Sequence, residues 1–554
     1  MATKDSSRNQ QNDSDSDSAL LWMLARFLRP YWKTLLAVCI MLVSVSALGL
    51  LPPFLIQQAV DGPITQGDLN GLAPLGVIYL GSIVLLFVLR FSSTYLLQTA
   101  GQNALVDLRQ VLFDHIVLQD MRFFNTTPVG QLVARMSNDI EALTELVSTS
   151  FVVVVTNLIT VAGIVIVMFG LNWRMALIGL AVLPIMIGTT IYFRRRIRAN
   201  ASRYHKTVAD YLAYVNEQLG GMLVVQLFGL QTRSRGDFDI INMQVRDVHS
   251  EWRDSYTAYT SILQVLTSVG LALVLWGGGQ GVLAGWATLG TLIAFVEYSR
   301  RSFEPLLQLA DQVAQIQTAL AAGDRIARML RVEPRIQDGA RTVDPAAVER
   351  SVTLPHVNFS YDPGTPVLRD VSLHVPAGQR VAIVGATGAG KTSLAGLLTR
   401  LYDVDSGCVC IGGIDVRELS QTDLRELVTV VPQNPYCFDG TVADNLCLFR
   451  DDFSREAMRH AAEMARAAPF IERLPGSYDY KLLPGGADLS QGQRQLLALA
   501  RALLHSPDSV LVLDEATSSI DTETEALIQQ ALETALHGRT SIIIAHRLST
   551  VRDA

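Results

Sequence analysis

The sequence predicts a multidomain protein in which a six-helix, all-α transmembrane domain is followed by a soluble α/β domain. Two observations support this fold class. The chain is 49% hydrophobic and only 18% charged, and its first 330 residues or so contain long stretches without charge. The later part instead contains short apolar runs of strand length, and one of them leads into a glycine-rich turn and then a helical pattern.

The N-terminal residues 1–19 are polar and rich in Ser, Asp, Asn and Gln, so we expect a disordered tail. No cleavable signal sequence is recognisable in it. Residues 20–28 are apolar but contain Arg26, a pattern typical of an amphipathic helix on the inner face of a membrane.

The transmembrane domain is predicted over residues 20–330, because about 20 apolar residues in a helix cross roughly 30 Å of hydrocarbon. The expected spans are residues 34–60, 72–89, 146–173, 175–193, 255–284 and 286–310. The last two come from one long apolar stretch that breaks at Gly285-Trp286. Core helices of soluble proteins rarely stay uncharged over such lengths, and six such stretches argue against a soluble domain.

Basic residues indicate the orientation of the spans. Six follow the fourth span: Arg194, Arg195, Arg196, Arg198, Arg203 and Lys206. The loop 61–71 has two acids and no Lys or Arg. The N-terminus and the soluble domain are therefore predicted to lie in the cytoplasm, with the spans in the cytoplasmic (inner) membrane.

The cytoplasmic segments 90–145 and 194–254 are long, and we expect helical hairpins that extend beyond the bilayer. Each has a short interruption near its middle, at 123–131 and at 220–229. Residues 331–350, with two prolines and a glycine among many charges, are predicted to be the linker to the soluble domain at 351–554.

A phosphate-binding loop follows the apolar run 381–384 and matches the pattern G-x-x-x-x-G-K-[ST]. It comprises Gly385, Ala386, Thr387, Gly388, Ala389, Gly390, Lys391 and Thr392, and Ser393 comes next. Backbone N–H groups of such a loop and the following helix N-terminus favour anions. Lys391 would contact the β- and γ-phosphates of ATP, and Thr392 would ligate Mg²⁺. A glycine-rich turn in an unrelated α/β protein is the alternative, which the flanking strand and helix disfavour.

Further residues are predicted to complete this site. Asp514 and Glu515 end an apolar strand, where Asp514 would hold Mg²⁺ and Glu515 would polarise the attacking water. His546 follows the strand 541–545 and can contact the γ-phosphate. Tyr361 could stack on adenine, and Gln433 could ligate the metal. Taken singly, His546 or Tyr361 is more often an ordinary packed residue, but their order around a phosphate loop favours a site.

A further motif after the phosphate loop resembles the signature of a known protein family. Leu489, Ser490, Gln491, Gly492 and Gln493 resemble the L-S-G-G-Q motif of ATP-binding cassette (ABC) transporters, and a turn with Ser518 and Asp521 follows. Residues 20–554 are similar throughout to an exporter-type half-transporter, like bacterial multidrug and lipid exporters. The resemblance implies an α/β P-loop NTPase cassette, an ATP hydrolase with Glu515, His546 and Lys391 as catalytic residues, and ATP and Mg²⁺ as cofactors.

The resemblance also implies that two cassettes meet head to tail, so that Ser490 and Gly492 act on the partner's nucleotide. The partner is a second half-transporter, in a homodimer or a heterodimer. The interruptions at 124–131 and 220–229 match turns that couple membrane domain and cassette. Two features depart from the family: Pro484 replaces a commonly acidic residue before the signature, and the cassette is expected to lack its C-terminal end because the chain stops at Ala554.

The predicted function is ATP-driven export of a small amphiphilic molecule, drug or lipid through a dimer by alternating access. A membrane-bound regulatory or sensing ATPase without cargo is the alternative, and the intact Glu515 and His546 disfavour it. The net charge of −7 and the lack of a basic–aromatic patch argue against nucleic acid. Glu297 is the only acid between Trp286 and Ser299, so it is a candidate for the cargo path. An ion pair with Arg301, four residues on, is the alternative for Glu297.

Overall fold

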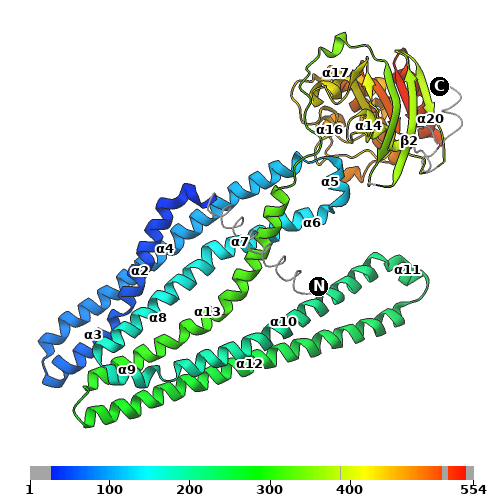
Figure 1. Ribbon diagram of the computed structural model, residues 1–554. Helices are drawn as coiled ribbons and strands as arrows, with labels where there is room; N and C mark the ends of the chain where they lie inside the picture. The colour runs from blue at the N-terminus through cyan, green and yellow to red at the C-terminus, as the bar shows by residue number, and fades with distance from the viewer. Residues whose placement is uncertain (1–26, 363, 387, 515–521, 545–554) are drawn as a thin grey trace. The chain divides into compact units, whose positions relative to one another are not determined.

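A computed structural model of the chain describes residues 27–362, 364–386, 388–514 and 522–544. The predicted tail at 1–19 lies outside them. So do five motif residues: Thr387, Glu515, Ser518, Asp521 and His546. The chain divides into two compact units (Figure 1). The helical domain comprises Met1–Ile116 and Gly130–Val332, and the cassette comprises Val117–Val129 and Glu333–Ala554.

The helical domain is built from long helices with a few irregular turns. Its α-helices are α2 (Trp32–Gly49), α3 (Leu51–Ala59), α4 (Leu69–Val117), α6 (Val129–Ala134), α7 (Ile140–Glu145), α8 (Phe151–Leu171), α9 (Trp173–Leu180), α10 (Leu183–Gly220), α11 (Met222–Leu227), α12 (Gln231–Leu283) and α13 (Leu289–Leu330). A 3-10 turn precedes α2 at Arg29–Tyr31, and π-helical turns lie at Val60–Ile64, Arg135–Asp139 and Leu146–Ser150.

Five helical segments in the described part of the chain are long and apolar enough to cross a membrane. They are Arg29–Ile64, Leu69–Val117, Val129–Leu171, Trp173–Gly220 and Gln231–Leu283. Helix α13 is also long enough, with 42 residues, but its first half already contains charged residues at 297, 300, 301 and 304. Those charges make it less apolar than the other five. The helix count is thus roughly consistent with the six predicted spans.

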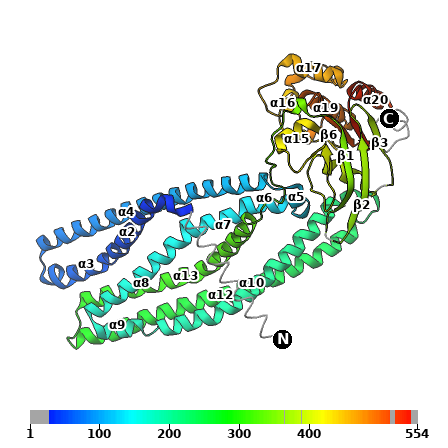
Figure 2. The same ribbon diagram turned by 45° about the horizontal axis from the view of Figure 1, so that its top comes forward.

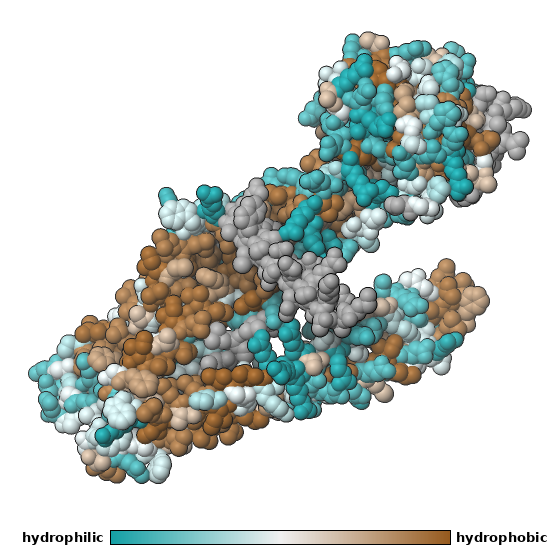
Figure 3. Space-filling view, in the orientation of Figure 1, coloured by the Kyte–Doolittle hydropathy of each residue, from teal (hydrophilic) through white to brown (hydrophobic). Residues whose placement is uncertain are grey.

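Apolar side chains cover the outside of these helices. Val77, Leu80 and Phe87 on α4 are 71%, 64% and 67% exposed. Figure 3 shows the corresponding broad brown surface on the helical domain. Large apolar side chains exposed over such an area would be unfavourable in water, whereas lipid accommodates them. The surface therefore supports a membrane environment for this domain.

A break in the first span is stabilised from α13. Helix α2 ends at Gly49 and α3 begins at Leu51, directly before two prolines. Because Pro53 has no N–H, the carbonyl of Gly49 loses its helical partner. Arg301 donates from Nη1 to that carbonyl at 2.9 Å, and Tyr298 donates from its hydroxyl to the carbonyl of Leu50 at 2.6 Å. The kink is therefore satisfied by α13 side chains.

The segments 90–145 and 194–254 break where the interruptions were predicted. Helices α10 and α12 run side by side and are joined through the short α11, with Gly229 in the left-handed region at φ 63° (Figures 1 and 2). In the other segment, α5 (Met121–Thr126) ends at Thr127, whose backbone is extended before Pro128. Asp120 caps α5 by accepting from the N–H of Phe123 at 3.0 Å. Residues 117–129 belong to the cassette unit.

The cassette contains two sheets with the helices around them. The strands are β1 (Val352–Ser360), β2 (Pro366–Val375), β3 (Arg380–Ile383), β4 (Cys410–Ile411), β5 (Ile414–Asp415), β6 (Val428–Val431), β7 (Val510–Asp514) and β8 (Ser541–Ile544). The helices besides α5 are α14 (Lys391–Leu398), α15 (Gln421–Leu427), α16 (Val442–Cys447), α17 (Arg455–Met464), α18 (Ala468–Ile471), α19 (Gln491–His505) and α20 (Thr522–Leu536). Short 3-10 turns lie at Pro345–Ala347, Ser477–Asp479 and Pro484–Gly486.

One sheet is antiparallel, in the order β2-β1-β4-β5, and the other is parallel, in the order β3-β8-β7-β6. In the parallel sheet Ile383 and Asp514 both lie opposite Ile544. All five residues of β7 are buried, as expected for a strand covered on both faces. Ligands of such sheets bind at the carboxyl ends of the strands, which is the edge where β3, β7 and β8 end together.

Candidate nucleotide site

The phosphate loop connects β3 to α14 at this edge. Gly388 and Gly390 have φ of 85° and 87°, a conformation that favours glycine. A Cβ atom on Gly390 would also come within 2.8 Å of Leu368. Gly385, Ala386 and Ala389 are exposed, so their backbone can face a ligand. The loop has the open, curled backbone that a phosphate requires.

Lys391 is the first residue of α14 and is buried, with 8% exposure. Its Nζ donates to the carbonyls of Gly385 at 2.8 Å and Ala386 at 3.0 Å. The ammonium therefore lies across the loop, and its partners are neutral carbonyl groups. A phosphate anion is a stronger acceptor than a neutral carbonyl, so ATP can take over these hydrogen bonds.

The donor set for Mg²⁺ comes from three elements. Asp514 ends β7 and is 7% exposed, and its Oδ1 has no hydrogen-bond partner among the described residues. Thr392 in α14 and Gln433 after β6 are exposed. A buried carboxylate oxygen without a partner is unfavourable unless a ligand satisfies it. Oxygen ligands of these types are those that Mg²⁺ prefers, so these residues fit the ion.

Tyr361 lies beside the loop, and both its hydroxyl and its ring already contact other residues. Its hydroxyl donates to Ser393 Oγ at 2.9 Å. Its ring packs at near right angles against Phe359 and Tyr402, with centroid distances of 4.8 and 5.1 Å. Stacking of Tyr361 on adenine therefore stays a prediction. The hydroxyl contact to Ser393 was not foreseen from the sequence.

Helix α5 (Met121–Thr126), which belongs to the cassette unit, contacts this aromatic group. Asn125 donates from Nδ2 to the hydroxyl of Tyr402 at 2.6 Å, and burial raises the pKa of Tyr402. A chain of contacts thus runs from Asn125 through Tyr402 and Tyr361 to Ser393 in α14. Since 277 residues separate Asn125 from Tyr402, no local sequence pattern could have indicated this contact.

The signature motif forms the start of α19. Ser490 is the N-cap: its hydroxyl accepts from the N–H of Gln493 at 3.2 Å, and Gln493 Oε1 accepts from the N–H of Ser490 at 2.9 Å. Leu489 and Gly492 are buried, whereas Ser490 is exposed. The positive end of a 15-residue helix is therefore presented at the surface. Gln491 occupies the usual glycine position of the motif within the first turn, and Pro484 begins a 3-10 turn before it.

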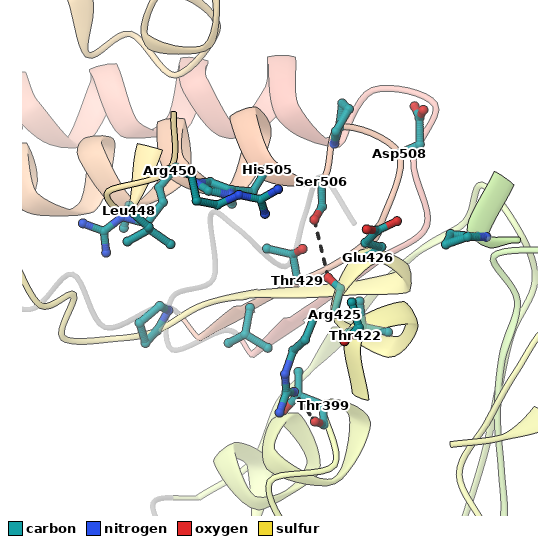
Figure 4. A pocket seen from close by; sticks show the side chains of 18 of the residues that line it. Thr399, Thr422, Arg425, Glu426, Thr429, Leu448, Arg450, His505, Ser506 and Asp508 are labelled. Carbon is teal, nitrogen blue, oxygen red and sulfur yellow. Dashed lines mark hydrogen bonds between the residues drawn. The ribbon is translucent and has the colours of Figure 1, made fainter. Parts of the chain in front are cut away.

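A groove of about 940 Å³ lies on the cassette away from the phosphate loop (Figure 4). Its lining includes Arg425, Leu448, Arg450 and His505 from α15, α19 and the segment after α16. Burial lowers the pKa of His505, whose Nε2 lies 3.0 Å from the carbonyl of Leu446. Charged side chains of both signs and apolar side chains together give the groove an amphiphilic lining.

The helical domain contains a cavity of about 540 Å³ between α2, α4, α8 and α13. Glu297 is not among its lining residues. The Glu297 carboxylate instead accepts from Arg301 Nε at 2.9 Å and lies 3.6 Å from Arg300 Nε. The structure thus shows the intrahelical ion pair that was the alternative for this residue. The ion pair favours that alternative, and a place for Glu297 in the cargo path stays a prediction.

Comparisons with known proteins decide the family. Residues 35–306 match the family model of the ABC transporter transmembrane region, and residues 368–518 match the ABC transporter model. The chain is 33% identical over 541 residues to the uncharacterized ABC transporter ATP-binding protein YknV of Bacillus subtilis (strain 168), covering 97% of this chain and 89% of that one. The chain belongs to the ABC transporter family.

Two other relatives have more descriptive names. The ATP-dependent lipid A-core flippase of Desulfotalea psychrophila is 32% identical over 95% of this chain and 91% of its own. The probable multidrug resistance ABC transporter ATP-binding/permease protein YheH of Bacillus subtilis is 33% identical over 88% of this chain and 73% of its own. The predicted exporter-type half-transporter, its fold class and its ATP hydrolysis coupled to transport are thereby confirmed, and the ABC transporter is a multi-pass membrane protein.

Proposed function

We propose that this ABC transporter is a half-transporter that exports a small amphiphilic molecule, a drug or a lipid, across the cytoplasmic membrane. The observation that carries the proposal is the pairing, in one chain, of a complete phosphate loop with a helical domain that encloses a polar and apolar cavity. The names of the lipid A flippase and multidrug relatives support cargo of this class. The N-terminus and the cassette lie in the cytoplasm, where ATP is available.

The active unit is a dimer, because one cassette supplies only half of each nucleotide site. Lys391 and Asp514 belong to the phosphate-loop half, whereas the exposed Ser490 at the N-terminus of α19 is free to face the ATP of a partner. Mg²⁺, held by Thr392, Gln433 and Asp514, would neutralise charge that develops on the phosphates. A homodimer has two such sites, and a heterodimer with a related chain remains the alternative.

Coupling between cassette and membrane domain uses the two cytoplasmic turns. One turn already contacts its own cassette through Asn125 and Tyr402. The other, at α11, exposes Leu223, Leu227 and Phe228 to 70%, 71% and 73%. Exposed apolar side chains on a helical turn are a surface that commonly docks into a groove of a partner. Closure of the cassettes on ATP then moves the turns and opens the cavity outward, and hydrolysis resets the cycle.

Mixing two inactive variants tests the shared site. Lys391→Ala disables every phosphate loop, and Ser490→Arg disables every signature, so each homodimer has no intact site. A mixed dimer contains one site in which the unmodified Lys391 and the unmodified Ser490 meet. We expect ATPase activity to return only when the two variants are co-expressed and co-purified with different tags. A co-purified pair that stays inactive while both variants fold would contradict the head-to-tail site.

Uptake into inside-out vesicles tests export. With the wild-type protein, ATP should drive uptake of a fluorescent amphiphile or labelled lipid, because the cassette then faces the external buffer. Vesicles with Glu515→Gln protein provide the matched control and should show no ATP-dependent uptake. A regulatory or sensing ATPase would hydrolyse ATP in the same vesicles without moving any member of a broad panel of amphiphiles.

A further inference from the structure

The cavity of the helical domain is lined by polar as well as apolar side chains. Its polar lining residues include Arg90, Gln98, Asn157, Arg301, Glu304 and Gln308. Polar residues of this kind inside a membrane domain are costly unless they face water, each other or a ligand. Which of them are already partnered within the chain therefore decides what a ligand would meet.

Arg301 is already partnered. Its Nε donates to Glu297, and its Nη1 donates to the carbonyl of Gly49 at the break of the first span. The charge of Arg301 is therefore balanced by Glu297, and much of its hydrogen-bonding capacity stabilises the kink. Arg301 contributes little net charge to the cavity.

Arg90 and Glu304 differ from Arg301 in their lack of an ion-pair partner in the described part of the chain. Both side chains are exposed, and among the described residues neither makes an ion pair. Arg90 extends from α4 and Glu304 from α13, so two opposite charges face one cavity from different helices. The free charges on the cavity wall are thus one cation and one anion.

The depth of these charges indicates where a ligand's polar part would lie. At about 1.5 Å per residue, Arg90 lies roughly 31 Å along α4 from Leu69, and Glu304 lies roughly 22 Å along α13 from Leu289. The hydrocarbon core is about 30 Å thick. With the proposed orientation, both residues lie in the cytoplasmic half of the span, Arg90 near the level of the inner-leaflet head groups and Glu304 deeper in the hydrocarbon.

Neutral groups add hydrogen-bonding capacity between these charges. Asn157 donates from Nδ2 to Gln308 Oε1 at 3.1 Å, which leaves the second N–H of Asn157 for another acceptor. Thr156 Oγ1 is buried and has no hydrogen-bond partner among the described residues. A polar head group would satisfy these atoms, whereas an apolar ligand would leave them unsatisfied.

We propose that this cavity binds the head group of a zwitterionic phospholipid, with the phosphate on Arg90 and the ammonium on Glu304. A purely anionic head group would be repelled by Glu304, and a purely cationic one by Arg90, so only a ligand with both charges satisfies both residues. The inference deepens the proposed function: if the chain is an exporter, the site names the class of its lipid cargo.

Binding without nucleotide tests this assignment separately from transport. Purified full-length protein in detergent is titrated with short-chain phosphatidylethanolamine, phosphatidylglycerol and an alkyltrimethylammonium amphiphile, and the dissociation constants are measured by native mass spectrometry. We expect phosphatidylethanolamine to bind about tenfold to a hundredfold more tightly than either singly charged ligand, the effect of one charged hydrogen bond. Equal affinity for all three would overturn the proposal.

Two substitutions test the separate roles of Arg90 and Glu304 in binding the head group. Arg90→Gln should lower the affinity for both phosphate-bearing lipids. Glu304→Gln should lower the affinity for phosphatidylethanolamine and raise the affinity for phosphatidylglycerol, so that the two affinities converge. Arg300→Gln is the matched control, because Arg300 lies in the same helix but outside the cavity lining and is 70% exposed. A Glu304→Gln protein with an unchanged ratio of the two affinities would overturn the assignment.

The outcomes separate this inference from the proposed function. If a variant loses its thermal unfolding transition, the wild-type comparison of the three ligands decides. Preferential zwitterion binding without ATP-driven uptake would contradict export but support the site. Uptake of amphiphiles with no preference for the zwitterion would contradict the site but support export.

Discussion

Glu515→Gln is expected to lower the ATP turnover of this transporter by about 10²- to 10⁴-fold while ATP binding is retained, because a general base contributes a factor of this size. Glu515 itself lies outside the described residues. It directly follows Asp514, which ends β7 at the edge where the phosphate loop begins. We propose that its carboxylate acts as the general base that orients the attacking water, a role that the amide of Gln cannot fill because it cannot accept the proton.

The measurement compares steady-state hydrolysis with the dissociation constant for ATP. Because hydrolysis resets the cycle, ATP should also hold the variant as a closed dimer that elutes early in size-exclusion chromatography. Glu533→Gln is the matched control: Glu533 lies in α20 and is exposed, so its loss should change neither quantity. Turnover near the wild-type rate in Glu515→Gln would remove Glu515 from the catalytic role.

Lys391→Ala should instead weaken ATP binding itself, by about tenfold to a hundredfold, as expected when a charged hydrogen bond is lost. Without ATP, Lys391 Nζ donates to the carbonyls of Gly385 and Ala386, so the ammonium is already held at the loop. Its transfer to the phosphates requires little reorganisation. Removal of the side chain deletes the only contact that carries a full positive charge within the described loop residues 385–386 and 388–392.

Isothermal titration calorimetry with ATP and a melting curve of the variant check this result. The melting curve is needed because Lys391 is only 8% exposed, and its truncation could also loosen α14. Lys481→Ala is the control: the Lys481 side chain is 72% exposed and pairs at the surface with Asp439, so ATP affinity should not change. An ATP affinity unchanged by Lys391→Ala would show that the phosphates bind elsewhere.

Local patterns predicted the cassette correctly because its chemistry is encoded in short segments. The loop from Gly385 to Thr392 needs glycines at particular positions, and the two that adopt a positive φ are Gly388 and Gly390. The strand that ends at Asp514 is apolar throughout because it is buried on both faces. The membrane helices were equally predictable, since their length and lack of charge follow from the thickness of the bilayer.

Contacts between distant segments could not be predicted in this way. Tyr361 has aromatic neighbours, but its bond to Ser393 depends on how β1 packs against α14. Asn125 reaches Tyr402 only because residues 117–129 fold with the cassette. Neither contact leaves a periodic signal in the sequence, because the partners are brought together by packing alone.

The charged residues of the membrane helices also differ in what the sequence alone predicts and what only packing determines. The sequence by itself determined that Glu297 is an ionisable residue deep in an apolar helix and that Arg301 lies one turn away. Only the tertiary structure decided that Arg301 also holds the carbonyl of Gly49, and that Arg90 and Glu304 line the cavity without an ion pair in the described part of the chain. The physical reason is that spacing along a helix determines neighbours on that helix, whereas the packing of separate helices determines which charges have partners.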